Sequence, residues 1–105
     1  MKFFTIKYLS KLYILHNLYF KHKYYLKRKS YSDSDEDLYI LSSLGKKGFY
    51  VDVGCHHPIR LNNCHLLYLN GWSGINIDPS ENSIKLFDFA RKKDTNICSA
   101  VSLKK

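Results

Sequence analysis

Two short runs of apolar residues, each with an aspartate at or near its end, constrain the fold of this chain most. The runs are FYVDV at residues 49–53, followed by a glycine, and GINID at residues 74–78, followed by a proline. Their length and their content of β-branched and aromatic residues are typical of buried strands. Between them, leucines at helical spacing over residues 62–69 lead to a glycine at position 71. A strand, a helix and a second strand in this order predict a βαβ unit with parallel strands.

Helical patterns also lie on both sides of this unit. Residues 34–44 begin with Ser34 and Asp35, either of which could cap a helix, and glycines at 45 and 48 end it. A further helix begins at Ser80 and ends with three basic residues, 91–93, in a last turn where the helix dipole favours cations. Residues 95–101 form a third apolar run. The sequence therefore predicts an α/β fold with about three parallel strands and helices between them.

The residues at the predicted strand ends indicate a ligand site, because open parallel sheets bind ligands outside the carboxyl ends of their strands. These residues are Asp52, Gly54 and Asp78. Gly54 allows a sharp turn and a close approach of the backbone to a ligand. The Asp78 carboxylate could accept hydrogen bonds from both hydroxyls of a ribose. The glycine-rich dinucleotide fingerprint and the Walker loop are absent. The alternative is that both aspartates are ordinary strand-end acids.

Several segments in register extend this pattern. FYVDVGCHHPIRLNN, LLYLNGWSGINIDP, SIKLFDFARKKD and ICSAVS resemble the FkbM-like family of S-adenosylmethionine-dependent methyltransferases. The resemblance covers about residues 31–102. It implies a Rossmann-like methyltransferase sheet larger than the three strands that can be read here, so the domain is expected to be truncated. The chain divides accordingly into a basic helical segment, residues 1–30, and a partial methyltransferase domain, residues 31–105.

The resemblance also implies roles for individual residues. Asp52 and Gly54 fall on the first cofactor motif of the family. Asp78 falls on the acid that holds the ribose of S-adenosylmethionine, and Ala100 falls near the strand end on the adenine side. The implied activity is transfer of a methyl group, usually to an oxygen, of a small-molecule or glycan acceptor. No catalytic residue can be assigned from the sequence.

An acidic tract at residues 31–37 stands where the family has Y-S-Q-x-G-E-D. Glu36 and Asp37 match its acidic pair and are expected to lie close to the cofactor or the substrate. Asp33 and Asp35 replace the glutamine and the glycine of this tract, which changes the turn expected there.

His56 and His57 directly follow Gly54. They either contact the cofactor or substrate, or belong to a polar loop whose path Pro58 fixes. The three cysteines contain no C-x-x-C pair, and the spacing of cysteine and histidine does not fit a structural zinc site. We therefore expect no metal and no disulfide framework, which favours a cytoplasmic protein.

The first 30 residues contain eight Lys or Arg and no acid, whereas residues 31–105 contain nine basic and nine acidic residues. Within this basic segment, residues 12–20 form the longest stretch without Lys or Arg, shorter than the roughly 20 residues that a membrane-spanning helix needs. The segment could pack on the domain that follows, lie on an anionic membrane surface, or bind nucleic acid, which is the least favoured. A second hypothesis for function is therefore a non-enzymatic basic protein that binds a membrane surface or nucleic acid through residues 1–29.

Overall fold

The computed structural model describes residues 9, 11–21, 28–45 and 47–101 of the 105-residue chain. The elements are η1 (His16–Phe20), α2 (Glu36–Leu44), β1 (Phe49–Val53), α3 (His65–Leu69), β2 (Ser73–Asp78), α4 (Glu81–Ala90) and β3 (Thr95–Cys98). The strands form one parallel sheet in the order β1-β2-β3. The predicted α/β fold with three parallel strands and intervening helices is confirmed.

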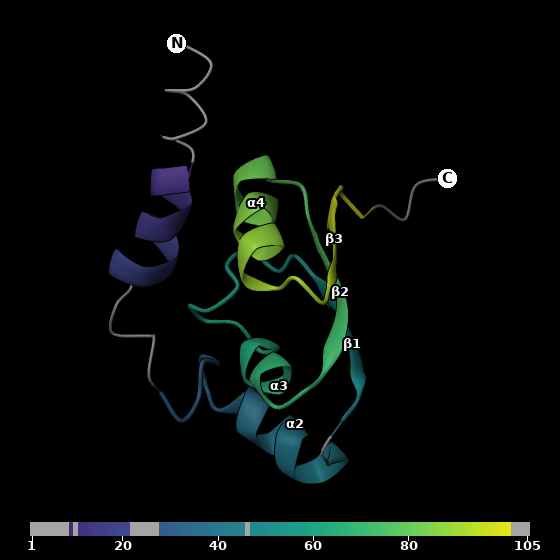
Figure 1. Cartoon of the computed structure of the whole chain (residues 1–105). Helices are drawn as coiled ribbons and strands as arrows, with labels where there is room; N and C mark the ends of the chain where they lie inside the picture. The colour runs from purple at the N-terminus through teal and green to yellow at the C-terminus, as the bar shows by residue number, and fades with distance from the viewer. Residues whose placement is uncertain (1–8, 10, 22–27, 46, 102–105) are drawn as a thin grey trace.

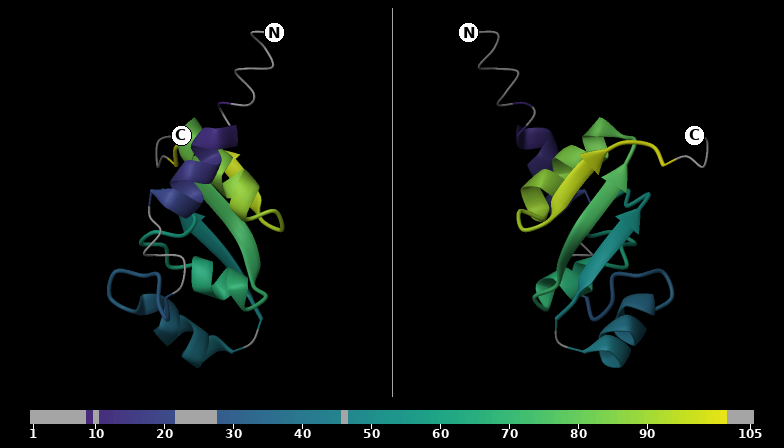
Figure 2. Two further views of the ribbon diagram at one scale, coloured as in Figure 1. Left: turned by 60° about the vertical axis from the view of Figure 1, so that its left-hand side comes forward. Right: turned by 90° about the vertical axis from the view of Figure 1, so that its right-hand side faces the viewer.

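The helices α3 and α4 lie on the same face of the sheet, and the helical turns before residue 21 lie on the outer side of α4 (Figure 1). This arrangement follows from the strand order. Crossovers between parallel strands are right-handed, so successive crossovers in a sheet that grows in one direction place their helices on one face. Figure 2 shows the strands from the opposite side, where no helix covers them. The described part of the fold therefore has one covered and one open sheet face.

The open face changes the environment predicted for the first strand. Phe49, Val51 and Val53 are 63%, 58% and 57% exposed, whereas Tyr50 between them is 7% exposed. The prediction that residues 49–53 form a buried strand is therefore right for the strand but wrong for the burial of Phe49, Val51 and Val53. The apolar run predicts that a strand forms at these residues. Which of its side chains are buried depends on where the crossover helices pack against the sheet.

The described chain has three buried clusters, and the two larger ones connect helices to the sheet and to the loops. One contains Tyr50, Cys64, Leu67 and Trp72, and joins α3 to the sheet. The other contains Leu18, Tyr31, Ile59 and Leu86, and joins η1 to α4 and to the loop after β1.

Leu18 is fully buried in this second cluster. Tyr19 also meets the ring of Phe89 edge-on, with the ring centroids 6.5 Å apart. Residues 14–20 of the basic segment therefore pack on the part of the chain that follows, which was one of the three alternatives for this segment. Residues 1–8, 10 and 22–27 lie outside the described chain, and membrane or nucleic-acid contact through residues 1–29 stays a prediction. No helix in the described part of the chain has the length and apolar character needed to cross a membrane.

The predicted helix starts are partly right. Ser80 caps α4, and its Oγ accepts the N–H of Ser83 at 3.3 Å. At α2, however, Asp35 holds the capping position in a left-handed conformation, with φ of 61°, and its side chain makes no capping bond. The capping oxygen instead comes from Ser32, whose Oγ accepts the N–H of Asp37 at 3.0 Å. Asp35 therefore holds the capping position as predicted, but its side chain does not supply the capping bond.

Arg91 differs most from its prediction. The helix α4 ends at Ala90, and Arg91 follows it with no exposed surface. Its Nη1 donates to the Tyr50 hydroxyl at 2.9 Å, and its Nη2 donates to the Pro58 carbonyl at 2.8 Å. It also pairs with Asp94 at 3.3 Å. The prediction that Arg91 sits in the last helical turn is wrong. Instead, its guanidinium ties the end of α4 to β1 and to the loop after it.

Candidate functional site

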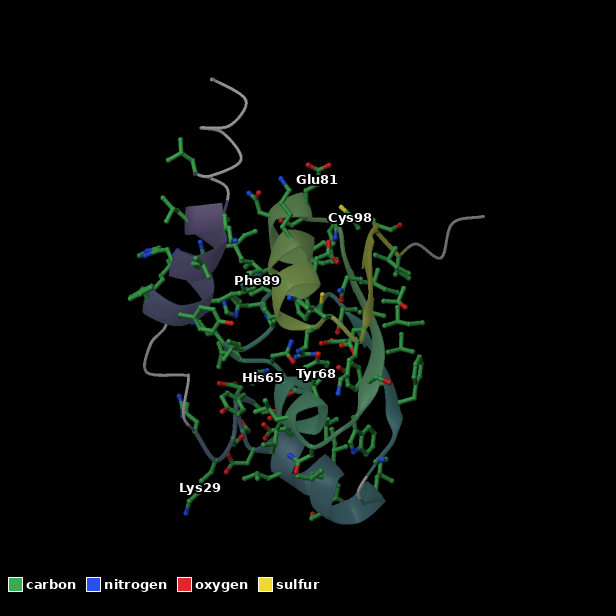
Figure 3. The ribbon with its side chains drawn as sticks, in the orientation of Figure 1. Lys29, His65, Tyr68, Glu81, Phe89 and Cys98 are labelled. Carbon is green, nitrogen blue, oxygen red and sulfur yellow. The ribbon has the colours of Figure 1, made fainter. Side chains whose placement is uncertain are left out.

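The carboxyl ends of the three strands meet at one edge of the sheet. Just beyond β1, the N–H groups of Gly54 and Cys55 both donate to the Ile77 carbonyl of β2, at 2.7 and 3.2 Å. The N–H of Ser99, after β3, donates to the Asp78 carbonyl at 3.0 Å. The labelled side chains of Glu81 and Cys98 mark this end of the molecule in Figure 3. The backbone thus brings the three predicted strand ends side by side.

A cavity of about 260 Å³ lies at this edge. Its lining comes from the ends of all three strands: Val53, Gly54, Ile77, Pro79, Ser99, Ala100 and Val101. Gly54 has φ of +71°, and a Cβ added there would meet no atom within 4 Å. Glycine is therefore favoured by the backbone conformation and not by lack of space. Of the predicted site residues, Gly54 and Ala100 share this cavity.

Asp78 lies between Ile77 and Pro79, which both line the cavity, and is itself 8% exposed. Its Oδ2 accepts the N–H of His56 at 3.1 Å, and its Oδ1 accepts the N–H of Ser80 at 2.9 Å. A carboxylate can accept about four hydrogen bonds. Asp78 therefore fixes the loops after β1 and β2 and keeps further acceptor capacity.

Asp52 lies outside the lining of the strand-end cavity. Its Oδ2 accepts a hydrogen bond from Asn62 Nδ2 at 3.3 Å. Burial raises the pKa of the Asp52 carboxyl, and the positive charge of Arg91 opposes this shift. The Asp52 side chain thus faces the buried polar groups behind the loop after β1.

Asn62 organises that loop, a role that the sequence did not reveal. It is 2% exposed, and its Nδ2 donates to the carbonyls of Cys55 and His57 at 3.3 and 2.8 Å. Its Oδ1 accepts from the N–H of Cys64 and from Arg91 Nη2, both at 2.8 Å. The helix α3 begins at His65, and Cys64 holds its capping position. No local pattern in the sequence distinguishes Asn62 from its neighbour Asn63.

Glu36 and Asp37 do not line the strand-end cavity. Asp37 is fully buried, and its carboxylate accepts from the Ser30 hydroxyl at 2.5 Å and from the N–H of Tyr31 at 2.7 Å. Glu36 accepts the N–H of Ser34 at 2.9 Å. Within the described chain, the acidic pair therefore orders the segment that leads into α2.

The two histidines after Gly54 have different environments. His57 is buried, and its Nδ1 accepts the N–H groups of Ile59 and Arg60 at 3.0 and 2.9 Å. A neutral imidazole then carries its proton on Nε2, which lies 3.2 Å from the Asn17 carbonyl oxygen. His57 thus fixes a polar loop. The exposed side chain of His56 lines a second cavity.

The buried thiols are poor nucleophiles. Burial raises the pKa of Cys55 and of Cys64 to about 12 each, so both stay protonated at neutral pH. Within the described ranges, no three His, Cys, Asp or Glu side chains are grouped as metal ligands would be.

The fold and the strand-end cavity define an α/β protein with a parallel sheet. Searches of protein-family models, curated proteins and solved structures give no match to this chain.

Proposed function

We propose that this chain binds S-adenosylmethionine at the strand-end cavity, as the front part of a methyltransferase domain of the FkbM-like type. The observation that carries the proposal is that Gly54 and Ala100, 46 residues apart, line one cavity beside Asp78. The acceptor class is a small molecule or a glycan, with an oxygen as the methylated atom.

The cavity fits part of such a cofactor. Small-molecule sites usually have volumes of about 300–1,000 Å³, so a cavity of about 260 Å³ suits the adenosine half. Val53, Ile77 and Pro79 supply apolar surface for a flat base. The remaining acceptor capacity of Asp78 suits ribose hydroxyls. When bound, the sulfonium of the cofactor supplies the methyl group, and this chain's residues hold the nucleoside.

Calorimetric titration of S-adenosylmethionine and S-adenosylhomocysteine into the full chain tests the proposal. We expect saturable binding of both, because the adenosine half is common to them. Ala100→Leu should abolish binding by filling the cavity, since Ala100 is exposed and the larger side chain need not disturb the core. Asp78→Ala should weaken binding as well.

Asp88→Ala is the matched control, because Asp88 is an exposed acid of α4 that lines a different cavity. Circular dichroism of each variant establishes that it is folded. Absence of binding by the folded wild-type chain, or unchanged binding by Ala100→Leu, contradicts the proposal.

A further inference from the structure

A second cavity, of about 450 Å³, lies between η1, the loop after β1 and the start of α4. Its lining is largely polar: Tyr13, Asn17, Lys21, His56, His57, Arg60, Ser80, Asn82, Ser83 and Leu86. We call it the basic cavity. It borders the strand-end site, and none of the described lining residues is common to both.

The charge of this lining is one-sided. Lys21 comes from the end of η1 and Arg60 from the loop after β1, 39 residues later, yet both border the same space. Among the described residues, no Asp or Glu is part of the lining. Two cations that border one concave surface create a local positive potential that attracts anions.

The walls of the basic cavity are held by hydrogen bonds. The π-helical turn of η1 closes through the N–H of Lys21, which donates to the His16 carbonyl at 2.7 Å. The same turn is joined to the opposite wall by His57 and the Asn17 carbonyl. Single π-turns of this kind occur frequently at functional sites. The backbone that carries Lys21 is thus fixed relative to the loop that carries Arg60.

We propose that the basic cavity binds the phosphate monoester of a small polyhydroxylated metabolite, such as a sugar phosphate. Lys21 and Arg60 would hold the phosphate, because charge-assisted hydrogen bonds to phosphate are among the strongest available to a protein. Neutral groups in the same lining, Tyr13 and Asn82, offer donors and acceptors for hydroxyls. The inference does not depend on methyl transfer.

Titration of the ¹⁵N-labelled full chain at constant ionic strength tests this inference, with inorganic phosphate, glucose 6-phosphate and neutral glucose as probes. We expect saturable amide shifts at His56 and Asn82, tighter binding of glucose 6-phosphate than of phosphate, and no binding of glucose. Lys21→Gln and Arg60→Gln should each raise the Kd for glucose 6-phosphate about tenfold. The same change at Lys85, exposed on α4 and lining a different cavity, should leave it unchanged.

Lys21→Gln is the decisive variant, because Lys21 is exposed and its loss should not unfold the chain. Equal weakening by Lys21→Gln and Lys85→Gln would show diffuse surface charge and overturn the inference. So would unsaturable shifts, or binding to anionic vesicles or an RNA oligonucleotide that glucose 6-phosphate does not compete away. Binding of S-adenosylmethionine, measured separately, reports on the other cavity alone.

Discussion

The backbone N–H of His56 donates to Asp78 Oδ2 across 3.1 Å, so a side chain at the end of β2 holds the loop after β1. The other oxygen of Asp78 holds Ser80, at the start of α4. Gly54, two residues before His56, and Pro79, directly before Ser80, line the strand-end cavity, whereas His56 and Ser80 line the basic cavity. One carboxylate therefore positions the boundary between the two candidate sites.

Replacing Asp78 with asparagine should destabilise the chain by about 1 kcal/mol, because the new amide nitrogen cannot accept the N–H it faces and leaves a partly buried donor unpaired. Urea unfolding measures this free energy. Asp88→Asn is the control, since Asp88 is exposed and the new amide keeps an acceptor oxygen for Asn96. Equal stability of the two variants would contradict the role assigned to Asp78.

Arg91→Met should cost about 3–5 kcal/mol, the usual result of removing one partner of a buried ion pair. The variant leaves Asp94 without its cation and the Pro58 carbonyl without the Arg91 donor, while Asn62 Oδ1 keeps only the N–H of Cys64. Lys92→Met removes an equal charge from an exposed neighbour and should change stability by less than about 0.5 kcal/mol. Urea unfolding measures the free energy of unfolding of both variants, and circular dichroism without denaturant shows whether each variant is folded.

The strands could be predicted from the sequence because the residues that specify each strand are neighbours in the chain. Residues 49–53 were predicted and observed with the same bounds, and the start of α4 at Ser80 follows from its capping hydroxyl. The environment of Arg91 could not be predicted in this way. Its acceptors lie at Tyr50, Pro58 and Asn62, 29 to 41 residues away in the sequence, and only the folded backbone brings them together.

The candidate site was predictable in outline only. The rule that ligands bind beyond the carboxyl ends of parallel strands indicated Gly54 and Asp78. In the structure, Gly54 lines a cavity and Asp78 lies beside it. Asp52 faces away from that cavity toward Asn62, because side chains alternate along a strand and one residue decides the face. The basic cavity could not be predicted, since its two cations belong to segments whose approach depends on how η1 packs.

Gly74→Ala should destabilise the chain far more than Gly54→Ala. A Cβ at Gly74 would lie 2.0 Å from the Tyr50 carbonyl oxygen, a backbone atom of the paired strand, so β1 and β2 would have to separate. At Gly54 the space is open, and the cost is only that of a left-handed conformation, about 1 kcal/mol. Thermal unfolding of the two variants gives the comparison. A similar loss in both would show that the strands are not packed this closely.

His65 should make the chain sensitive to mild acid. Burial lowers the pKa of His65 to about 3, with a further contribution from the positive charge of Arg91. Its ring meets Tyr31 edge-on, with centroids 4.5 Å apart, and His65 Nδ1 has no hydrogen-bond partner within the described chain. His65 and Tyr68 both lie on the side of α3 that faces α4 (Figure 3). A protonated imidazole at this position would be a buried cation near Arg91.

In the unfolded chain, His65 takes up its proton near pH 6.5, whereas in the folded chain it does so only near pH 3. The unfolded state therefore binds more protons between these values, and the free energy of unfolding falls as the pH falls, by up to about 1.4 kcal/mol per pH unit. The contribution is complete above pH 6.5. In His65→Leu this loss should disappear between about pH 6.5 and 5, above the range where most carboxyls titrate. His16→Leu, at an exposed histidine, should keep the wild-type slope, and a slope retained in His65→Leu would place the sensitive group elsewhere.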